Sequence, residues 1–358
     1  MPRPIRAAVS ASALAHNLAI ARGHAGSAKV WAVLKANAYG HGLERAAGAL
    51  GAADGFAVLD FQEAARLRAN GVRKPILMLE GPFQALDVPL LGRQGLTPVI
   101  HNAEQVEMLA GTDPGAAIGV YLKANSGMNR LGFTAEGLRA AYDCLRANPR
   151  VRDVTLMTHF ADADGAGGIK GQLAEFERMI KPFSPVPRSV ANSAALLRFP
   201  GQTAADWVRP GIMLYGCSPF ADRSAQSLGL KPVMTLSSQI ISIQHLKRGE
   251  RVGYGFSYEA AAALTLGIVA CGYADGYPRH APSGTPVLVN GQRASTVGRV
   301  SMDMIAVDVS HLPGAGIGTP VTLWGEGLSA DEVGAAAGTL SYELFTKLTS
   351  RVPVIEAA

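Results

Sequence analysis

Residues 55–79, GFAVLDFQEAARLRANGVRKPILML, carry the pattern that decides the fold. The stretch begins and ends with short apolar runs, Gly55–Leu59 and Pro75–Leu79. Between them lies a helix-like stretch, Phe61–Asn70, followed by Gly71 at the position where glycine commonly ends a helix. A strand, a helix and a second strand in this order predict parallel strands joined by a crossover helix.

The same alternation extends through the first two thirds of the chain. Helical patterns such as Ala103–Ala110 and Ala135–Asn148 separate several short apolar runs. The runs are Val30–Leu34, Gly55–Leu59, Pro75–Leu79, Leu96–Ile100, Ile118–Leu122, Val154–Met157, Arg188–Ala191 and Asp206–Val208. Eight strands alternating with helices favour a (β/α)8 barrel over an open sheet.

The pattern changes after about Gly229, where the helical periodicity disappears. Turn signals now separate strand-like runs, and Asn290-Gly291 is typical of a hairpin turn. The runs are Val233–Ile243, Leu264–Ala270, Thr285–Val289, Ser295–Val309 and Pro320–Leu323, and a helix is expected over Ala330–Ala337. We therefore predict an α/β protein with a (β/α)8 barrel domain at residues 1–228 and a mostly β domain at residues 229–358.

Composition and charge exclude several classes of partner. The chain of 358 residues is 48% hydrophobic and 17% charged, as in an ordinary globular protein. Its formal charge of +5 comes from scattered residues, with pairs such as Lys247-Arg248 as the longest basic runs, which argues against a nucleic-acid surface. No apolar run reaches the ~18 residues of a membrane span, so no membrane partner is expected.

The three cysteines, Cys144, Cys217 and Cys271, lie far apart and form no pair with metal-binding spacing. The first 25 residues lack the unbroken apolar core of a signal peptide. Both observations favour a reducing, cytoplasmic location, and no metal site is expected.

Polar side chains stand where several of the barrel runs end. They are Lys35, Lys123, His159, Asn192, Ser193 and Arg209. The carboxyl ends of barrel strands meet at one mouth, so these side chains are expected to converge. A buried lysine there can form a Schiff base, and the backbone of Gly211-Ile212 can bind a phosphate. Taken alone, Lys35 is better explained as an exposed charge at a strand end, and Gly211-Ile212 as a plain turn.

Longer motifs surround these residues. They are VLKANAYGHG at 33–42, NSGMNRLGF at 125–133, MTHF at 157–160, RPGIMLYG at 209–216, VGYG at 252–255, GYADGYPR at 272–279 and SMDM at 301–304. In this order they resemble the motifs of alanine racemases, and the resemblance covers nearly the whole chain. The stretch with Asn125 and Asn129 is more similar to the catabolic isoform than to the biosynthetic one. Asn125 stands where many members have aspartate, and Ser301 where some have cysteine.

The resemblance implies a barrel that binds pyridoxal 5'-phosphate (PLP), followed by a β domain, in a head-to-tail homodimer. Each active site would then combine the barrel of one chain with the β domain of the other. The implied reaction is the interconversion of L- and D-alanine, which would either supply D-alanine for peptidoglycan or catabolise it.

The resemblance also implies a role for each site residue. Lys35 would bind PLP as a Schiff base and act as a base on one face of the substrate, and the partner's Tyr254 would act on the other face. The cofactor residues would be Lys35, Tyr39, His159, Asn192, Ser193, Arg209, Gly211, Ile212 and Tyr342, with Arg209 bonded to His159 and facing the ring nitrogen of PLP. Arg130, Tyr273, Met302 and Asp303 would contact the substrate. Lys123 matches a lysine that several members carry as a carbamate.

Three alternatives remain at this stage. The first is a broad-specificity amino-acid racemase, or a decarboxylase, of the same fold. The second is a PLP-binding protein of cofactor homeostasis, although single-barrel proteins of that kind lack a β domain. The third discards the resemblance and makes the chain a barrel aldolase that uses Lys35 without a cofactor.

Overall fold

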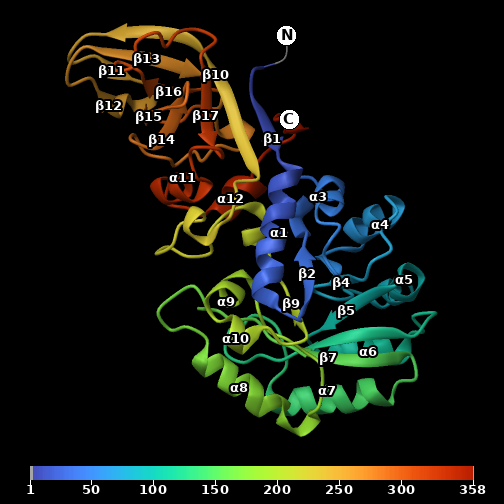
Figure 1. Ribbon diagram of the computed structural model, residues 1–358. Helices are drawn as coiled ribbons and strands as arrows, with labels where there is room; N and C mark the ends of the chain where they lie inside the picture. Colours follow the sequence, from blue (N-terminus) through green and yellow to red (C-terminus); the bar gives the residue numbers. More distant parts are fainter. Residues whose placement is uncertain (1–2, 358) are drawn as a thin grey trace.

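The computed structural model describes residues 3–357 and consists of a barrel and a β domain (Figure 1). Eight parallel strands close into the barrel, as predicted, and each lies in one of the eight apolar runs or overlaps it. The barrel strands are β2 (Lys29–Val33), β3 (Gly55–Val58), β4 (Ile76–Met78), β5 (Leu96–Ile100), β6 (Ile118–Lys123), β7 (Val151–Met157), β8 (Arg188–Ser189) and β9 (Trp207–Val208).

Helices and short 3-10 turns (η) connect these strands. They are α1 (Ala11–Ala25), α2 (Lys35–Tyr39), α3 (Leu43–Ala49), α4 (Phe61–Ala69), η1 (Ala85–Asp87), α5 (Val88–Gln94), α6 (Ala103–Gly111), α7 (Ala135–Ala147), α8 (Lys170–Ile180), η2 (Lys181–Phe183), α9 (Ser193–Arg198), α10 (Pro200–Thr203), η3 (Ile212–Tyr215) and η4 (Gln226–Leu228). Side-chain N-caps start several of them, since Asp60, Asn102 and Thr134 each accept a backbone N–H from the first turn. The three helices predicted in the barrel domain are confirmed to within one residue at each end, and so is the helix predicted over Ala330–Ala337.

Packed aromatic residues fill part of the barrel interior. Trp31 on β2 stacks on Trp207 of β9, with 4.2 Å between ring centroids. Its indole N–H donates to Tyr121 Oη at 2.9 Å, and this bond crosses the barrel, because β2 and β6 lie on opposite sides of the strand order. A Cβ on Gly55 would lie 2.2 Å from the Trp31 ring, so only glycine fits there.

The second part is mostly β, as predicted. Its elements are β1 (Arg6–Val9), β10 (Met234–Leu246), β11 (Arg251–Val252), η5 (Tyr254–Phe256), β12 (Tyr258–Glu259), β13 (Leu264–Val269), η6 (Tyr273–Asp275), β14 (Pro286–Val289), β15 (Gln292–Val297), β16 (Ile305–Asp308), β17 (Pro320–Trp324), α11 (Ala330–Ala336), α12 (Ser341–Thr346) and β18 (Val354–Glu356). The main sheet has the order β13-β16-β15-β14-β17-β10-β1-β18, and β10 also pairs with β13. Asn290-Gly291 forms the β14–β15 hairpin, because both residues have the positive φ that a type I′ turn needs.

Two features of this domain differ from the sequence pattern. The single run expected over Ser295–Val309 is wrong, because β15 ends at Val297 and β16 begins at Ile305. Gly298, with φ +72°, turns the chain into the loop between these strands, which includes SMDM at 301–304. In addition, β1 from the N-terminal end pairs with β10 and β18 in the β sheet. The division at residues 228 and 229 stays a prediction.

The β domain reaches the barrel through α11 and α12, which lie between its sheet and the barrel in Figure 1. Helix α12 packs on the chain just after α2, where a Cβ on Gly40 would lie 2.2 Å from the carbonyl oxygen of Phe345. Within residues 3–357, no helix is long and apolar enough to cross a membrane.

Candidate active site

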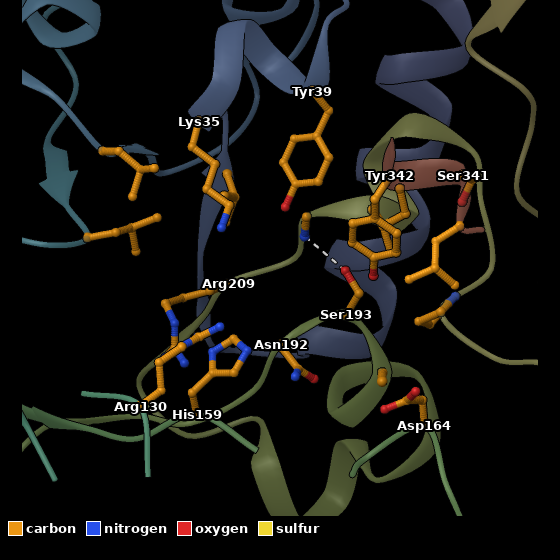
Figure 2. Close-up of a pocket in the computed structure, with 18 of the residues that line it drawn as sticks. Lys35, Tyr39, Arg130, His159, Asp164, Asn192, Ser193, Arg209, Ser341 and Tyr342 are labelled. Carbon is orange, nitrogen blue, oxygen red and sulfur yellow. Dashed lines mark hydrogen bonds between the residues drawn. The ribbon is translucent and has the colours of Figure 1, made fainter. Parts of the chain in front are cut away.

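A cavity of about 870 Å³ opens at the carboxyl ends of the barrel strands (Figure 2). Most of the predicted site residues line it, namely Lys35, Tyr39, Lys123, Arg130, His159, Asn192, Ser193, Arg209, Gly211, Ile212 and Tyr342. The cavity is also lined by residues that the sequence analysis missed, among them Glu80, His101, Asp331 and Ser341. Glu80 and His101 directly follow two predicted strands, so the strand-end rule applied to every run could have found both.

An unusual backbone segment follows Lys35. The residues of Ala36–Tyr39 all have φ between 51° and 56°, so α2 is a left-handed turn. Such a conformation costs L-residues about 1–2 kcal/mol each. The turn places Lys35 and Tyr39 side by side, with both side chains directed into the cavity (Figure 2).

The surroundings of Lys35 lower the pKa of its amine. Burial, and then the positive charge of Arg130, lower the pKa of Lys35 below its ordinary value. A lower pKa increases the fraction of neutral amine, which is the form that attacks a carbonyl carbon. Lys35 is therefore suited to form a Schiff base.

Beside Lys35 lies a set of donors that can hold a phosphate. The Gly211 N–H donates to Ser193 Oγ at 2.8 Å, the bond drawn in Figure 2. A Cβ on Gly211 would lie only 2.6 Å from Tyr39 Oη, so glycine keeps this cradle open. Burial raises the pKa of Tyr39 and of Tyr342, which keeps both hydroxyls protonated as donors. Asn192 caps α9 through Ala195 N and thereby orients Ser193.

Arg209 and His159 lie together on the opposite wall (Figure 2). The buried Arg209 guanidinium donates to Ser189 Oγ and to the carbonyl oxygen of Thr158, both at 2.6 Å. Burial lowers the pKa of Arg209 to about 10, so the group is still a cation at neutral pH. Burial and the Arg209 charge hold the pKa of His159 well below its ordinary value, so the imidazole is neutral. An Arg209–His159 hydrogen bond, expected from the resemblance, is not among those formed by residues 3–357.

Lys123 is buried at the end of β6. Its pKa is lowered to about 8 by burial and by the charges of Arg209 and Arg130. Within the described part of the chain it forms no ion pair with a carboxylate. This amine is therefore partly neutral near physiological pH and lies among cations.

Four predicted residues do not line this cavity. Tyr254, Tyr273, Met302 and Asp303 all belong to the β domain, and Tyr254 is 69% exposed. The loops are neighbours, because Tyr273 N donates to the carbonyl oxygen of Ser301 at 3.1 Å. The structure therefore brings the loops of Tyr273, Met302 and Asp303 together in the β domain, and all four residues lie outside the cavity of their own chain.

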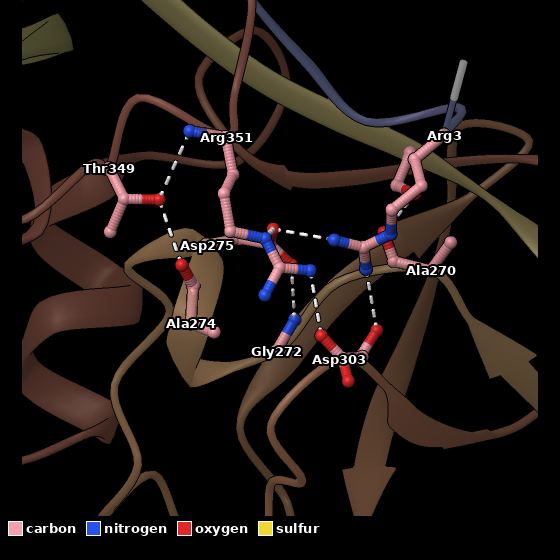
Figure 3. Close-up of polar contacts among 9 residues, drawn as sticks. Arg3, Ala270, Gly272, Ala274, Asp275, Asp303, Thr349 and Arg351 are labelled. Carbon is pink, nitrogen blue, oxygen red and sulfur yellow. Dashed lines mark hydrogen bonds and ion pairs between the residues drawn. The ribbon is translucent and has the colours of Figure 1, made fainter.

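A buried carboxylate fixes these loops (Figure 3). Asp275 is fully buried and accepts from Arg3 at 2.7 Å and from Gly272 N at 2.9 Å, and Arg351 lies 3.3 Å away. Arg3 also donates to the carbonyl oxygen of Asp303, and Arg351 to Asp303 Oδ1, both at 2.7 Å. The two arginines come from opposite ends of the chain, so both ends tie down the loop that includes Asp303.

The barrel mouth combines a lysine amine of lowered pKa with a set of donors that can hold a phosphate. This combination is typical of enzymes that bind a phosphorylated carbonyl compound through a Schiff base. Two family models match the chain, "Alanine racemase, N-terminal domain" over residues 9–219 and "Alanine racemase, C-terminal domain" over residues 233–356. The chain belongs to the alanine racemase family.

Individual alanine racemases are similar to this chain over nearly its whole length. An alanine racemase from Thiobacillus denitrificans is 57% identical over 354 residues, which cover 99% of this chain and 96% of that protein. The crystal structure of the biosynthetic alanine racemase from Pseudomonas aeruginosa has a TM-score of 0.97 at 50% identity and covers 99% of this chain and 100% of that chain. The alanine racemase from Acinetobacter baumannii has a TM-score of 0.94 at 38% identity, with 99% and 100% coverage.

The cradle generates a prediction at Gly211. A Gly211→Ala substitution puts a methyl group against Tyr39 Oη, and such overpacking costs about 1–3 kcal/mol, so the affinity for PLP falls roughly tenfold or more. Spectroscopic titration of the apoprotein with PLP measures this change. Gly171→Ala is the matched control, because its new Cβ meets nothing within 4 Å. Equal PLP affinity in both variants would contradict a phosphate site at this cradle.

Proposed function

We propose that this protein is an isomerase that interconverts L- and D-alanine with PLP bound at Lys35. The observation that supports it most is the buried amine of Lys35, with its lowered pKa, next to the cradle of Tyr39, Ser193 and Gly211, in a chain of the alanine racemase family. Bound PLP supplies an electron sink that stabilises negative charge on the substrate Cα.

The chain offers suitable partners for each end of that cofactor. We assign the phosphate to the hydroxyls of Tyr39, Ser193 and Tyr342 and to the backbone of Gly211-Ile212. Arg209 would face the ring nitrogen. A guanidinium that stays charged does not readily transfer a proton to that nitrogen. Arg209 would thus leave that nitrogen without a proton and would moderate the electron sink. His159 would contact the partner's Tyr254.

Racemisation needs a proton-transfer group on each face of the substrate. In our proposal Lys35 takes or returns the Cα proton on one face at its Nζ atom. The group on the other face is the partner's Tyr254, which agrees with the exposure of Tyr254 outside the cavity of its own chain. Arg130 would hold the substrate carboxylate in its guanidinium fork, and Tyr273, Met302 and Asp303 would close the site from the partner. The proposal therefore includes a homodimer with shared active sites.

Lys123 is proposed to carry a carbamate. Its lowered pKa leaves neutral amine available to attack carbon dioxide, which forms an N–C bond and releases one proton. The carbamate would place a negative charge between Arg130 and Arg209, where the described residues supply no paired carboxylate. Protein equilibrated with ¹³C-bicarbonate should show a carbamate carbon resonance, and Lys123→Ala should lack it.

The physiological role and location are also proposals. The stretch with Asn125 and Asn129 favours a catabolic role, whereas the biosynthetic Pseudomonas aeruginosa enzyme is 50% identical. Deletion separates the two roles, since loss of the biosynthetic enzyme creates a requirement for D-alanine and loss of the catabolic one stops growth on alanine. We propose a cytoplasmic location, in keeping with free cysteines at Cys144, Cys217 and Cys271.

The primary experiment measures the cofactor and the reaction in one sample. Purified protein with PLP should be yellow, should carry the cofactor on Lys35 after borohydride reduction and peptide mapping, and should convert L-alanine to D-alanine in chiral chromatography. A yellow protein that acts equally on serine and larger amino acids would instead be a broad-specificity racemase. A yellow protein with no turnover would be a carrier, and a colourless protein that PLP cannot reconstitute would overturn the assignment of Lys35.

Shared active sites generate a separate prediction. Lys35→Ala and Tyr254→Phe should each abolish racemisation when tested alone. Mixing the two variants under subunit exchange should restore roughly a quarter of the activity, because one site of each mixed dimer then has both native groups. A mixture that stays inactive while mass spectrometry detects mixed dimers would contradict a site built from two chains.

A further inference from the structure

The left-handed turn after Lys35 needs support from outside itself. None of the four residues in Ala36–Tyr39 is glycine, the residue that adopts positive φ without steric cost. Ala36 and Asn37 are also exposed, so packing of their side chains holds neither of them. The Asn37 side chain accepts the Leu43 N–H at its Oδ1 atom, at 3.0 Å, and the side chains of the second half of the turn are buried. Contacts on the backbone add to this support.

One of these contacts comes from a buried carboxylate on α4. Glu63 is only 7% exposed, and its Oε1 accepts the Asn37 N–H at 2.9 Å. Its Oε2 accepts the Leu59 N–H at the end of β3, at 3.3 Å. The N-cap of α4 fixes Glu63 in turn, because Glu63 N donates to Asp60 Oδ1 at 2.7 Å. Glu63 forms no ion pair with a basic residue within residues 3–357. Its carboxylate oxygens therefore act as acceptors for backbone N–H groups.

A buried imidazole holds the other side of the turn. His41 is completely buried, and its Nδ1 lies 2.9 Å from the carbonyl oxygen of Tyr39 and 3.1 Å from that of Ala38. Both neighbours are acceptors, so Nδ1 is the donor. The ring packs between Tyr215 and Phe345, with centroids 4.7 Å and 4.8 Å away. Its Nε2 has no hydrogen-bond partner in the described residues, so the ring is oriented by the Nδ1 bonds and by this packing.

We infer that Glu63 is a positioning residue that holds the left-handed turn and thereby keeps Lys35 and Tyr39 together at the cavity before the cofactor binds. His41 assists from the opposite side of the same turn. The inference rests on the proposed function, in which Lys35 bonds PLP and Tyr39 holds its phosphate. Glu63 itself takes no part in the chemical step and has no contact with the substrate.

The test compares two Glu→Gln substitutions on neighbouring helices. Glu63→Gln keeps the side-chain size but replaces one acceptor oxygen with a donor, so one backbone N–H loses its partner. Amide hydrogen exchange of residues 36–40 in the apoprotein should rise about tenfold, and the PLP dissociation constant should rise by a similar factor. The control Glu44→Gln removes the exposed ion pair with Arg66 between α3 and α4 and should leave both quantities unchanged.

A rescue variant distinguishes positioning from general destabilisation. Ala36 is exposed, so Ala36→Gly removes the steric cost of positive φ without removing a packed side chain. Added to Glu63→Gln, it should recover part of the PLP affinity, while the melting temperature of the whole protein does not recover.

Two results would overturn the inference. One is wild-type exchange at residues 36–40 in Glu63→Gln, and the other is a lower melting temperature with unchanged PLP affinity. Failure of the wild-type protein itself to bind PLP at Lys35 would refute the proposed function instead. Protease resistance and far-UV circular dichroism confirm that each variant is folded before these comparisons are made.

Discussion

The backbone of Ala36–Tyr39 is held in a conformation that its own residues disfavour, and the arrangement of the cavity depends on it. Contacts from two other helices and from the residues that follow it keep it there. Glu63 from α4 binds one side, His41 binds the other, and Phe345 of α12 packs where only Gly40 leaves room. Lys35 directly precedes this segment and Tyr39 is its last residue, and both line the cavity. Their relative position is therefore a property of the folded whole rather than of a local helix.

Positive charge is the second organising feature of the site. Lys35, Lys123, Arg130 and Arg209 line one cavity, and burial together with mutual repulsion lowers the pKa of the two lysines. The same effects keep His159 neutral. Glu80, Asp164 and Asp331 also line the cavity but form no ion pair with these cations in the described residues, so the positive charge favours an anionic ligand. The electrostatics of the mouth and the proposed chemistry thus agree.

The two parts of the chain depend on each other. The β domain contributes Tyr342 and Ser341 to the cavity wall through α12, while the N-terminal strand β1 completes the β sheet. Arg3 and Arg351, from the two ends of the chain, meet at the buried carboxylate of Asp275 and fix the loop with Asp303. The two ends of the chain therefore hold the loop that includes Asp303, which does not line the cavity of its own chain.

Local sequence patterns determined much of this protein. Short apolar runs specify the barrel strands, because a strand buried on both faces needs continuous apolar residues, and Asn290-Gly291 specifies a hairpin through its tolerance of positive φ. The polar residues after those runs were expected at one mouth because parallel strands end together.

Only the tertiary structure decided the pairing of the chain ends and the backbone conformation after Lys35. Strands β1 and β18 are short, and their pairing joins opposite ends of the chain, so no local pattern marks it. Residues 36–39 take a left-handed conformation that L-residues disfavour. Hydrogen bonds with Glu63, which is distant in sequence, and with the buried His41 outweigh the local steric cost.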